Sequence, residues 1–333
     1  ADRLYFEPLT AESVIEIHDK ENSKGKVLGV FVQFGDQTPL KIAKKLEEAN
    51  IKILGTSTKA IDLAEDRDLF SNILKKLKIN QPKNAISNNI QDSLDAAENI
   101  GYPVLIRPSY VLGGRAMEIA YESNSLESFA SKAMSVSSNN TILIDQYIEN
   151  ATEIDVDIIR DSKGKIFVAG IMEHIEEAGI HSGDSACSLP PFSISKNIED
   201  QIIDWVTKIS NEIDVIGLMN TQIALKNSKL YVLEVNPRAS RTVPFVAKSI
   251  GLPIAKIASK VMLGELLEDL LPSLERKKLH TYNVKESVFP FNKFDGVDLI
   301  LGPEMKSTGE VMGIDKDFLS AFIKSQIASG VVL

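Results

Sequence analysis

The sequence has little of several features that define whole classes of protein. Its single cysteine, Cys187, excludes an internal disulfide and a multi-cysteine zinc site, and it fits a reducing compartment. The longest apolar stretches, such as residues 27–34, are far shorter than the roughly 20 residues that a membrane span requires. Basic residues are outnumbered, with 37 Lys and Arg against 46 Asp and Glu. An acidic chain is a poor candidate for non-specific binding to nucleic acid or to a membrane surface.

The remaining composition is that of a folded globular protein. Of the 333 residues, 44% are hydrophobic and 25% charged, which predicts two packed domains rather than a disordered tail or a fibre. The N-terminus has no targeting segment, so we expect a soluble, cytoplasmic protein whose ligand is a small molecule. Arginine is scarce at eight residues, and five of them fall in the segments discussed below: Arg67, Arg107, Arg115, Arg238 and Arg241. An arginine in such a chain is often present for its planar, bidentate guanidinium.

The first 56 residues predict part of a Rossmann-like domain. Their periodicity indicates two helices and two apolar strands, at 11–22, 38–49, 27–34 and 51–54. Buried parallel strands joined by a helix are typical of α/β proteins. Two strands cannot cover both faces of a sheet, so we expect these residues to be the remainder of a domain whose earlier strands are absent.

The rest of the chain predicts an alternation of helices and hairpins. A helix is expected over 57–77, followed by an α+β segment over 85–144 and a hairpin over 153–173. Beyond it we expect, in order, a polar loop at 174–189, a helix at 197–213, a hairpin at 218–235, helices at 242–250 and 253–264, a connector at 302–313 and a last helix at 316–329.

The hairpin at 218–235 is the best candidate for a metal site. Strand periodicity puts Glu234 and Asn236 on one face, and a three-residue turn at 227–229 would place Gln222 opposite Glu234. Carboxylate and amide oxygens suit a hard cation such as Mg²⁺. The alternative is a half-exposed hairpin with a polar outer face. Two guanidiniums directly after the strand, Arg238 and Arg241, favour the metal site, because a metal-bound anionic substrate needs cations beside it.

A glycine-containing turn between two arginines is a weaker candidate for a phosphate site. Gly113 and Gly114 would let backbone N–H groups approach a ligand, and Arg107 and Arg115 would neutralise its charge. The segment is not a Walker A loop, which ends in Gly-Lys-Ser/Thr, and no Gly-x-Gly-x-x-Gly follows a strand. The alternative is a glycine hairpin with surface arginines.

The segment 172–187 concentrates histidines and acids and leaves two alternatives open. His174 and His181 lie there among four acidic residues, Glu173, Glu176, Glu177 and Asp184. A catalytic zinc site is one interpretation, but there is no His-Glu-x-x-His helix and glycines interrupt the segment. A polar wall that hydrogen-bonds a ligand is favoured. Cys187 is interpreted as a small core residue, because no base accompanies it.

Several strings taken together are specific to one family. They are Gln-Thr-Pro-Leu at 37–40, Ala-Glu-Asp-Arg at 64–67, Arg-Pro-Ser-Tyr-Val-Leu-Gly-Gly-Arg-Ala-Met at 107–117, His-Ser-Gly-Asp-Ser at 181–185 and Glu-Val-Asn-Pro-Arg at 234–238. With them, essentially the whole chain resembles the large subunit of carbamoyl phosphate synthetase. The segments 172–176 and 302–313 are similar to its C-terminal, carbamate-phosphorylating half.

The resemblance implies an α/β protein with an ATP-grasp fold, in which two α+β lobes enclose ATP, preceded by part of a Rossmann-like sheet domain. The implied domains are 1–56, the remainder of the pre-ATP-grasp domain; 57–301, the ATP-grasp domain, with a lid lobe at about 82–150 and a metal-binding lobe at 151–301; and 302–333, a connector and the start of a truncated regulatory domain.

The resemblance also implies site residues by position. Those implied to contact ATP are Arg67, Arg107, Gly113, Gly114, Gln146, Ile148, Glu153, Gly179, Ile180, His181, Ser182, Gln222 and Glu234. Of these, the two arginines would hold phosphates, the backbone at 146 and 148 would meet the adenine, and Glu153 and His181 would contact the ribose or nearby polar groups. Gln222, Glu234 and Asn236 match the family's ligands for two Mg²⁺ or Mn²⁺ ions. Asn236, Arg238 and Arg241 would be catalytic, and K⁺ is expected near the polar loop without assigned ligands.

The implied function is the ATP-dependent phosphorylation of carbamate to carbamoyl phosphate, for pyrimidine and arginine biosynthesis. The implied partners are the rest of the large subunit and a glutamine amidotransferase small subunit. Two alternatives stay open: another ATP-grasp enzyme, such as a biotin carboxylase, and a nucleotide-binding fragment without turnover.

Overall fold

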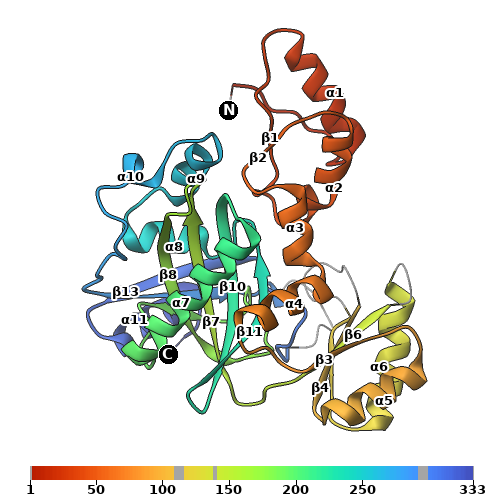
Figure 1. Ribbon diagram of the computed structural model, residues 1–333. Coiled ribbons are helices and arrows are strands. Elements are labelled where there is room, and N and C mark those ends of the chain that lie inside the picture. Colours follow the sequence, from red (N-terminus) through yellow and green to blue (C-terminus); the bar gives the residue numbers. More distant parts are fainter. Residues whose placement is uncertain (1, 109–115, 138–140, 292–298, 333) are drawn as a thin grey trace.

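The computed structural model describes residues 2–108, 116–137, 141–291 and 299–332 (Figure 1). Within these residues the strands form three sheets, of two, four and seven strands, and helices pack against each. Every helix of the described part is too short or too polar to span a lipid bilayer. The chain is an α/β protein, as the sequence predicts.

The N-terminal unit contains the two-stranded parallel sheet. Its elements are α1 (Ala11–Asn22), β1 (Val30–Phe31), α2 (Gln37–Glu48) and β2 (Ile53–Leu54). The parallel pairing of β1 with β2 is confirmed, with Val30 opposite Ile53. Both strands have only two residues, which is shorter than the apolar runs predict. Side chains of α2, such as Leu40 and Leu46, form the small core of this unit.

The single helix expected over residues 57–77 is wrong, because the chain breaks at Asp66. The two helices are α3 (Thr58–Glu65) and α4 (Arg67–Leu77). Asp66 has an extended backbone, with φ −78° and ψ 121°, and its side chain accepts a hydrogen bond from the Leu69 N–H at 2.9 Å. This is an N-cap, which satisfies a free amide of the new helix. Arg67 therefore lies in the first turn of α4.

A four-stranded antiparallel sheet forms the lobe at the lower right of Figure 1. Its strands run in the order β3 (Asn84–Ser87), β6 (Ile142–Gln146), β4 (Val104–Pro108) and β5 (Glu118–Ala120). Two helices, α5 (Ile90–Ile100) and α6 (Ser123–Val136), pack on it and on each other. These elements form the α+β segment that the sequence predicts over 85–144. The glycine turn at 112–114 lies outside the described residues.

The seven-stranded sheet is the centre of the molecule. Its order is β11 (Lys229–Asn236), β10 (Gly217–Lys226), β7 (Thr152–Arg160), β8 (Ile166–Glu177), β9 (Cys187–Leu189), β12 (Tyr282–Val288) and β13 (Gly309–Asp315). One face packs against α3, α4 and α7 (Lys196–Ile213) through a core that includes Ile154, Val156 and Trp205. The other face packs against α8 (Val243–Ile250), α9 (Ile254–Met262) and α10 (Leu267–Leu270).

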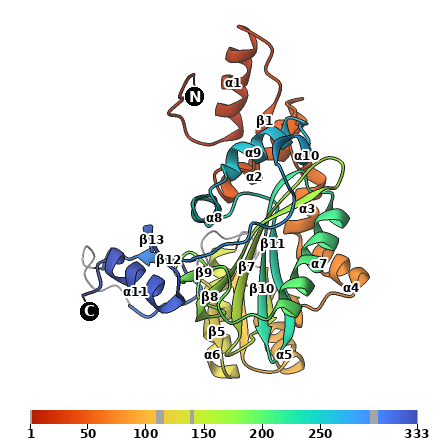
Figure 2. The ribbon, with the colours of Figure 1, turned by 90° about the vertical axis from the view of Figure 1, so that its left-hand side faces the viewer.

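The far end of this sheet corrects two expectations. The polar loop predicted at 174–189 is partly strand, because β8 continues to Glu177 and β9 covers 187–189. The connector predicted at 302–313 contains the first residues of β13, which pairs with β12, a strand that the sequence did not predict. Helix α11 (Phe318–Ser329) packs on both strands, and Figure 2 shows all three extending away from the rest of the chain.

Candidate functional site

A cleft of about 640 Å³ lies between the four-stranded and the seven-stranded sheets and reaches the helices α2 to α4. It is lined by every predicted site residue that the structure describes: Arg67, Arg107, Gln146, Ile148, Glu153, Gly179, Ile180, His181, Ser182, Gln222, Glu234, Asn236, Arg238 and Arg241. Gly113 and Gly114, and with them Arg115, lie outside the described residues. The residues that the sequence selects are thus brought together, whatever the role of each.

The β10–β11 hairpin places Gln222 opposite Glu234, as predicted, but by a different route. Its turn has two residues, Asn227 and Ser228, both with positive φ (51° and 60°), rather than three. A two-residue turn alone would pair Gln222 with Leu233. The register shifts between Gln222 and Ile223, so that Leu233 is the extra residue of a β-bulge and the pairing moves by one.

The bulge also connects the hairpin to the neighbouring helix. The carbonyl of Leu233 accepts a hydrogen bond from Arg67 Nη1 at 3.0 Å. Arg67 is at the start of α4, so this contact fixes the helix against the strand that bears Glu234. The break at Asp66 and the bulge at Leu233 are both local irregularities, and together they position one predicted phosphate-binding arginine.

Asp145, at the end of β6, holds two arginines at once. Arg67 Nη2 hydrogen-bonds Asp145 Oδ1, and Arg107 Nε lies 3.1 Å from Asp145 Oδ2. Burial raises the pKa of Asp145, but the charges of the two arginines outweigh burial and hold its pKa below the ordinary value. Arg107 Nη1 also lies 3.7 Å from Glu234 Oε2. Both guanidiniums therefore have fixed positions beside Glu234.

Three buried arginine nitrogens in the cleft make no hydrogen bond to the described residues, and of these only Arg107 Nε has an ion-pair partner, Asp145. Among the described residues, no acceptor hydrogen-bonds Arg67 Nε or Arg238 Nε, although both atoms are shielded from solvent. A buried donor without an acceptor costs free energy, so such a group usually indicates a ligand or water that the protein alone does not supply. A guanidinium N–H forms its strongest hydrogen bonds with an oxyanion.

The predicted metal ligands form one polar group on the hairpin. Asn236 Nδ2 donates to Glu234 Oε1 at 2.9 Å, and Gln222 Nε2 donates to Ser182 Oγ at 3.1 Å. The Glu234 side chain is 39% exposed, so its carboxylate is accessible from the cleft. One carboxylate and two amide oxygens are a donor set that fits a hard divalent cation, which completes its shell with water and substrate oxygens.

The segments 146–148 and 178–182 also line the cleft. A Cβ at Gly179, which has φ +108°, would lie 2.5 Å from the Tyr147 ring, so only glycine fits there. Tyr147 in turn donates its hydroxyl hydrogen to the Ala178 carbonyl at 2.8 Å. The N–H of Gln146 donates to the Lys83 carbonyl at 2.7 Å, and its side-chain oxygen accepts from the Lys83 N–H at 3.4 Å. Burial lowers the pKa of His181 below its ordinary value.

A second carboxylate that holds two arginines comes from the N-terminal unit. Asp36 precedes α2, and its Oδ1 lies 3.0 Å from Arg238 Nη2 while its Oδ2 lies 2.9 Å from Arg241 Nη2. Burial raises the pKa of Asp36, but Arg238 and Arg241 outweigh it and hold the pKa below its ordinary value. The next residue, Gln37, approaches Asn236 Oδ1 with its Nε2 at 3.5 Å. The N-terminal unit thus contributes directly to the cleft.

Comparison with known families decides the identity of the chain. The model of the carbamoyl-phosphate synthase L chain, ATP binding domain, matches residues 66–270, and that of the carbamoyl phosphate synthase preATP-grasp domain matches residues 1–63. The chain belongs to the carbamoyl phosphate synthase large-chain family. The break between α3 and α4 falls at the junction of the two matched domains.

Curated relatives agree with this assignment. The chain is 53% identical over its whole length to the carbamoyl phosphate synthase large chain of Archaeoglobus fulgidus, and spans 30% of that protein. It is 48% identical over its whole length to the large chain, C-terminal section, of Methanocaldococcus jannaschii, and spans 55% of that protein. The chain therefore spans about a third of the large chain of Archaeoglobus fulgidus and about half of the C-terminal section of Methanocaldococcus jannaschii.

Solved structures support the ATP-grasp fold. The biotin carboxylase of Campylobacter jejuni, in complex with β,γ-ATP, has a TM-score of 0.71 and 21% identity, with 84% of this chain and 63% of that chain covered. The biotin carboxylase domain of Hydrogenobacter thermophilus 2-oxoglutarate carboxylase has a TM-score of 0.72 and 19% identity, with 87% and 65% covered. At this identity the likeness concerns the fold alone.

Several cleft residues of this carbamoyl phosphate synthase-type chain were not predicted from the sequence. They are Asp36, Asp145, Asp155, Asn220 and Lys285. Asp145 could have been found as an acid that ends the apolar strand 142–144. Asp155 could have been found with Glu153 as alternate acids in a strand, both buried on the face opposite Ile154.

The two histidines of the 172–187 segment are separated in the structure. His174 lies in β8, is buried, and has its Nε2 3.1 Å from Asp155 Oδ2, whereas His181 lies in the turn that lines the cleft. In the described part of the chain, no three side chains of His, Cys, Asp or Glu are arranged to hold a metal. Burial raises the pKa of the neighbouring Glu153 to about 7. The zinc alternative therefore has no support in this geometry.

Proposed function

We propose that the cleft phosphorylates carbamate with MgATP to give carbamoyl phosphate, the second phosphorylation of a carbamoyl phosphate synthase. The observation that carries the proposal is the arrangement of arginines around the hairpin: Arg67 and Arg107 lie on one side of Glu234, and Arg238 and Arg241 follow the same strand. The reaction needs cations at two places, one for the nucleotide and one for the acceptor.

In this proposal the first pair of arginines binds the phosphates of ATP. Asp145 fixes both guanidiniums, and the unpaired Nε of Arg67 is available to a phosphate oxygen. Gly179, Ile180 and the segment 146–148 form the wall for adenine, and Glu153, His181 and Ser182 are the polar groups near the ribose. Gly113 and Gly114 are proposed to approach the phosphates on the basis of the sequence pattern and the resemblance.

Gln222, Glu234 and Asn236 are proposed to hold Mg²⁺, with Mn²⁺ as the alternative for the same oxygen ligands. When bound, two such ions would neutralise charge on the phosphate oxygens. The carboxylate of Glu234 supplies the negative charge that retains the cation, and the two amides orient it. K⁺ near the loop after His174 is part of the proposal without assigned ligands.

Arg238 and Arg241 are proposed to hold the acceptor and the transferred phosphoryl group, with Asn236 beside them. Carbamate is already an anion, so its oxygen can attack the γ-phosphoryl group without a general base. The residues must then orient the two reactants in line and stabilise the charge that develops. No covalent bond to the chain is formed.

The wider setting follows from the relatives and is also proposed. The rest of the large chain would supply carbamate, and a glutamine amidotransferase subunit would supply ammonia. The product would serve pyrimidine and arginine synthesis in the cytoplasm. The proposed domains remain 1–56, 57–301 and 302–333, although β13 of the last segment pairs within the central sheet.

The reverse reaction tests the proposal with only the groups that this chain contains. Carbamoyl phosphate and MgADP should yield ATP, measured by a coupled luminescence assay, and the yield should vanish without divalent cation and should not respond to glutamine. In the forward direction, ATP with ammonium carbamate should give carbamoyl phosphate, trapped chemically as hydroxyurea.

Two results would contradict the proposal. ATP hydrolysis that responds to bicarbonate with biotin, and not to carbamate, would favour a biotin carboxylase-type reaction. A chain that binds MgADP and unfolds cooperatively, but forms no ATP, would be a nucleotide-binding fragment without this activity.

A further inference from the structure

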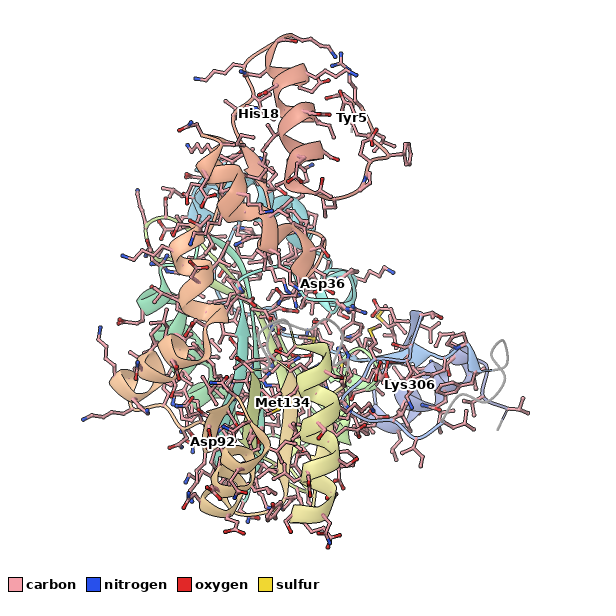
Figure 3. All side chains as sticks on the ribbon, turned by 90° about the vertical axis from the view of Figure 1, so that its right-hand side faces the viewer. Tyr5, His18, Asp36, Asp92, Met134 and Lys306 are labelled. Atoms are coloured by element: carbon pink, nitrogen blue, oxygen red, sulfur yellow. The ribbon has the colours of Figure 1, made fainter. Side chains whose placement is uncertain are left out.

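Asp36 makes the same contacts to two cleft arginines that a small oxyanion would make. Its Oδ1 forms an ion pair with Arg238 Nη2 at 3.0 Å, and its Oδ2 accepts a hydrogen bond from Arg241 Nη2 at 2.9 Å. Figure 3 shows Asp36 where the N-terminal helices meet the rest of the chain. A single O–C–O group thus bridges the two side chains proposed to hold the acceptor.

The backbone at Asp36 is strained. Its φ of 63° and ψ of −144° lie close to a region that is accessible essentially only to glycine. Aspartate tolerates the left-handed helical region, where ψ is near +45°, but this conformation lies outside it. A residue in such a conformation persists only when its surroundings stabilise it, and strain of this kind concentrates at ligand sites. Here the surroundings include the two arginines.

The contacts of Asp36 are open to exchange. The side chains of Asp36 and Arg241 are 35% and 48% exposed, and both residues line the cleft. An ion pair that water reaches contributes little net free energy, so another anion can replace the carboxylate at low cost. Arg238 is more buried, and its Nη1 donates to the Ala239 carbonyl at 3.2 Å, which keeps it in place when its partner changes.

The carboxylate matches the proposed substrate in chemistry. Carbamate has the same planar O–C–O group and the same charge as an aspartate side chain, and phosphate oxygens have similar spacing. Two guanidiniums that bind one of these groups will bind the others.

We propose that Asp36 is an internal competitor of the oxyanion substrate: its carboxylate occupies Arg238 and Arg241, and the substrate must displace it to bind. The inference rests on the proposed function, which assigns these two arginines to the acceptor. It adds that Asp36, a residue of the N-terminal unit, sets the affinity for the oxyanion. The affinity depends on the fraction of molecules in which Asp36 has released the two arginines.

The opposite role makes the opposite prediction. If Asp36 served to orient the arginines for the substrate, its removal would weaken binding. If it competes, its removal tightens binding, because the arginines are then free and the local charge is more positive by one.

Asp36→Gly tests this in the full 333-residue chain, because glycine removes the carboxylate and fits the backbone conformation. Binding of inorganic phosphate, measured by calorimetric titration, should tighten about tenfold, which corresponds to arginines that are released in roughly one molecule in ten. The KM for carbamoyl phosphate in the reverse reaction should fall by a similar factor, with the KM for MgADP unchanged. Asp36→Asn keeps the shape and loses the charge, and it should tighten phosphate binding in the same direction.

Asp214→Gly is the matched control. Asp214 also has a positive φ, 61°, and its Oδ1 pairs with Arg160 Nη1 at 3.0 Å, but neither residue is among the described residues that line the cleft. Phosphate affinity should not change in this variant.

The outcomes separate the inference from the function on which it rests. Unchanged or weaker phosphate binding in both Asp36 variants would overturn the inference. Arg241→Gln, made in the Asp36→Gly background, should abolish the gain in affinity. If phosphate binds as tightly without Arg241, the oxyanion does not bind at these arginines, and both the inference and the proposed acceptor site are wrong.

Discussion

Two carboxylates of this chain each hold a pair of arginines, and they differ in burial and in backbone. Asp145 is 7% exposed, lies on a regular strand and joins Arg67 to Arg107. Asp36 is 35% exposed and joins Arg238 to Arg241. Its backbone lies close to a conformation that essentially only glycine adopts. The first pairing connects β6, β4 and α4, and the second connects the N-terminal unit to the segment after β11.

The difference indicates two uses of the same contact. Breaking a buried pairing leaves charges that water cannot solvate, so Asp145 fixes its arginines permanently. In the proposal above, an anion from solvent replaces the Asp36 carboxylate, so that its arginines change partners. On this view the side of the cleft proposed for the nucleotide is rigid, and the side proposed for the acceptor is adjustable.

The largest expected effect comes from Glu234, which lies between the two pairs. Glu234→Gln keeps the shape of the side chain and removes the charge proposed to hold the cation. The rate of ATP formation from carbamoyl phosphate and MgADP should fall on the order of a thousandfold, or about 4 kcal/mol of transition-state stabilisation. Steady-state assays over a range of Mg²⁺ concentrations measure this loss.

Measurements of stability distinguish this loss of activity from a loss of folding. Glu234→Gln should unfold at nearly the same urea concentration as the parent, and Glu265→Gln, which alters an exposed ion pair with Lys260, should leave the rate unchanged. If the Glu234→Gln variant has a near-normal rate with the same Mg²⁺ dependence, Glu234 does not bind the cation and is a polar surface residue of the hairpin.

The β10–β11 hairpin shows which part of the candidate site could be predicted from the sequence. Periodicity alone put Glu234 and Asn236 on one face, which the structure confirms. The pairing with Gln222 came from a three-residue turn that does not exist, and a bulge at Leu233 compensates for the missing residue. The sequence analysis found no signal for the bulge, and the carbonyl of the bulged Leu233 accepts from Arg67, which is 166 positions away in sequence.

The elements that sequence reasoning missed are those whose burial is set by distant contacts. Strand β12 carries Asn283, Lys285 and Glu286 as buried polar residues, so it has no alternation of apolar side chains to detect. The helix break at Asp66 has a capping aspartate, yet the apolar periodicity continues across it. Asp36 gave no signal at all, because its role depends on two arginines about 200 positions later in the chain.

A smaller effect is expected from breaking the buried pairing. Asp145→Asn removes the charge between Arg67 and Arg107, which leaves two buried cations with one neutral acceptor. The free energy of unfolding should fall by about 3 kcal/mol, measured from the urea midpoint. Asp204→Asn, which breaks the exposed Lys208–Asp204 pair, should cost at most about 0.5 kcal/mol. An Asp145 variant as stable as this control would show that the buried pairing is not structural.

The same pairing predicts a direction for the pH dependence. The pKa of Asp145 is lower in the folded chain than its ordinary value, so its contribution to stability is fully present above that ordinary value. The contribution is lost as the pH falls through the lowered pKa. Asp145→Asn should therefore lose less stability in acid than the parent, when urea midpoints are compared at neutral pH and at about pH 3.

The smallest effect, and one of opposite sign, is expected at Asp36. Asp36→Gly relieves backbone strain of about 1–3 kcal/mol and loses an accessible ion pair worth about 0–1 kcal/mol. The net result should be a gain of about 1 kcal/mol in the free energy of unfolding, seen as a higher urea midpoint. Asp214→Gly should change stability less, because the left-handed helical conformation of Asp214 is one that aspartate tolerates. A loss of stability in Asp36→Gly as large as that of Asp145→Asn would mean that both carboxylates are structural, and the contrast between a rigid and an adjustable side of the cleft would not hold.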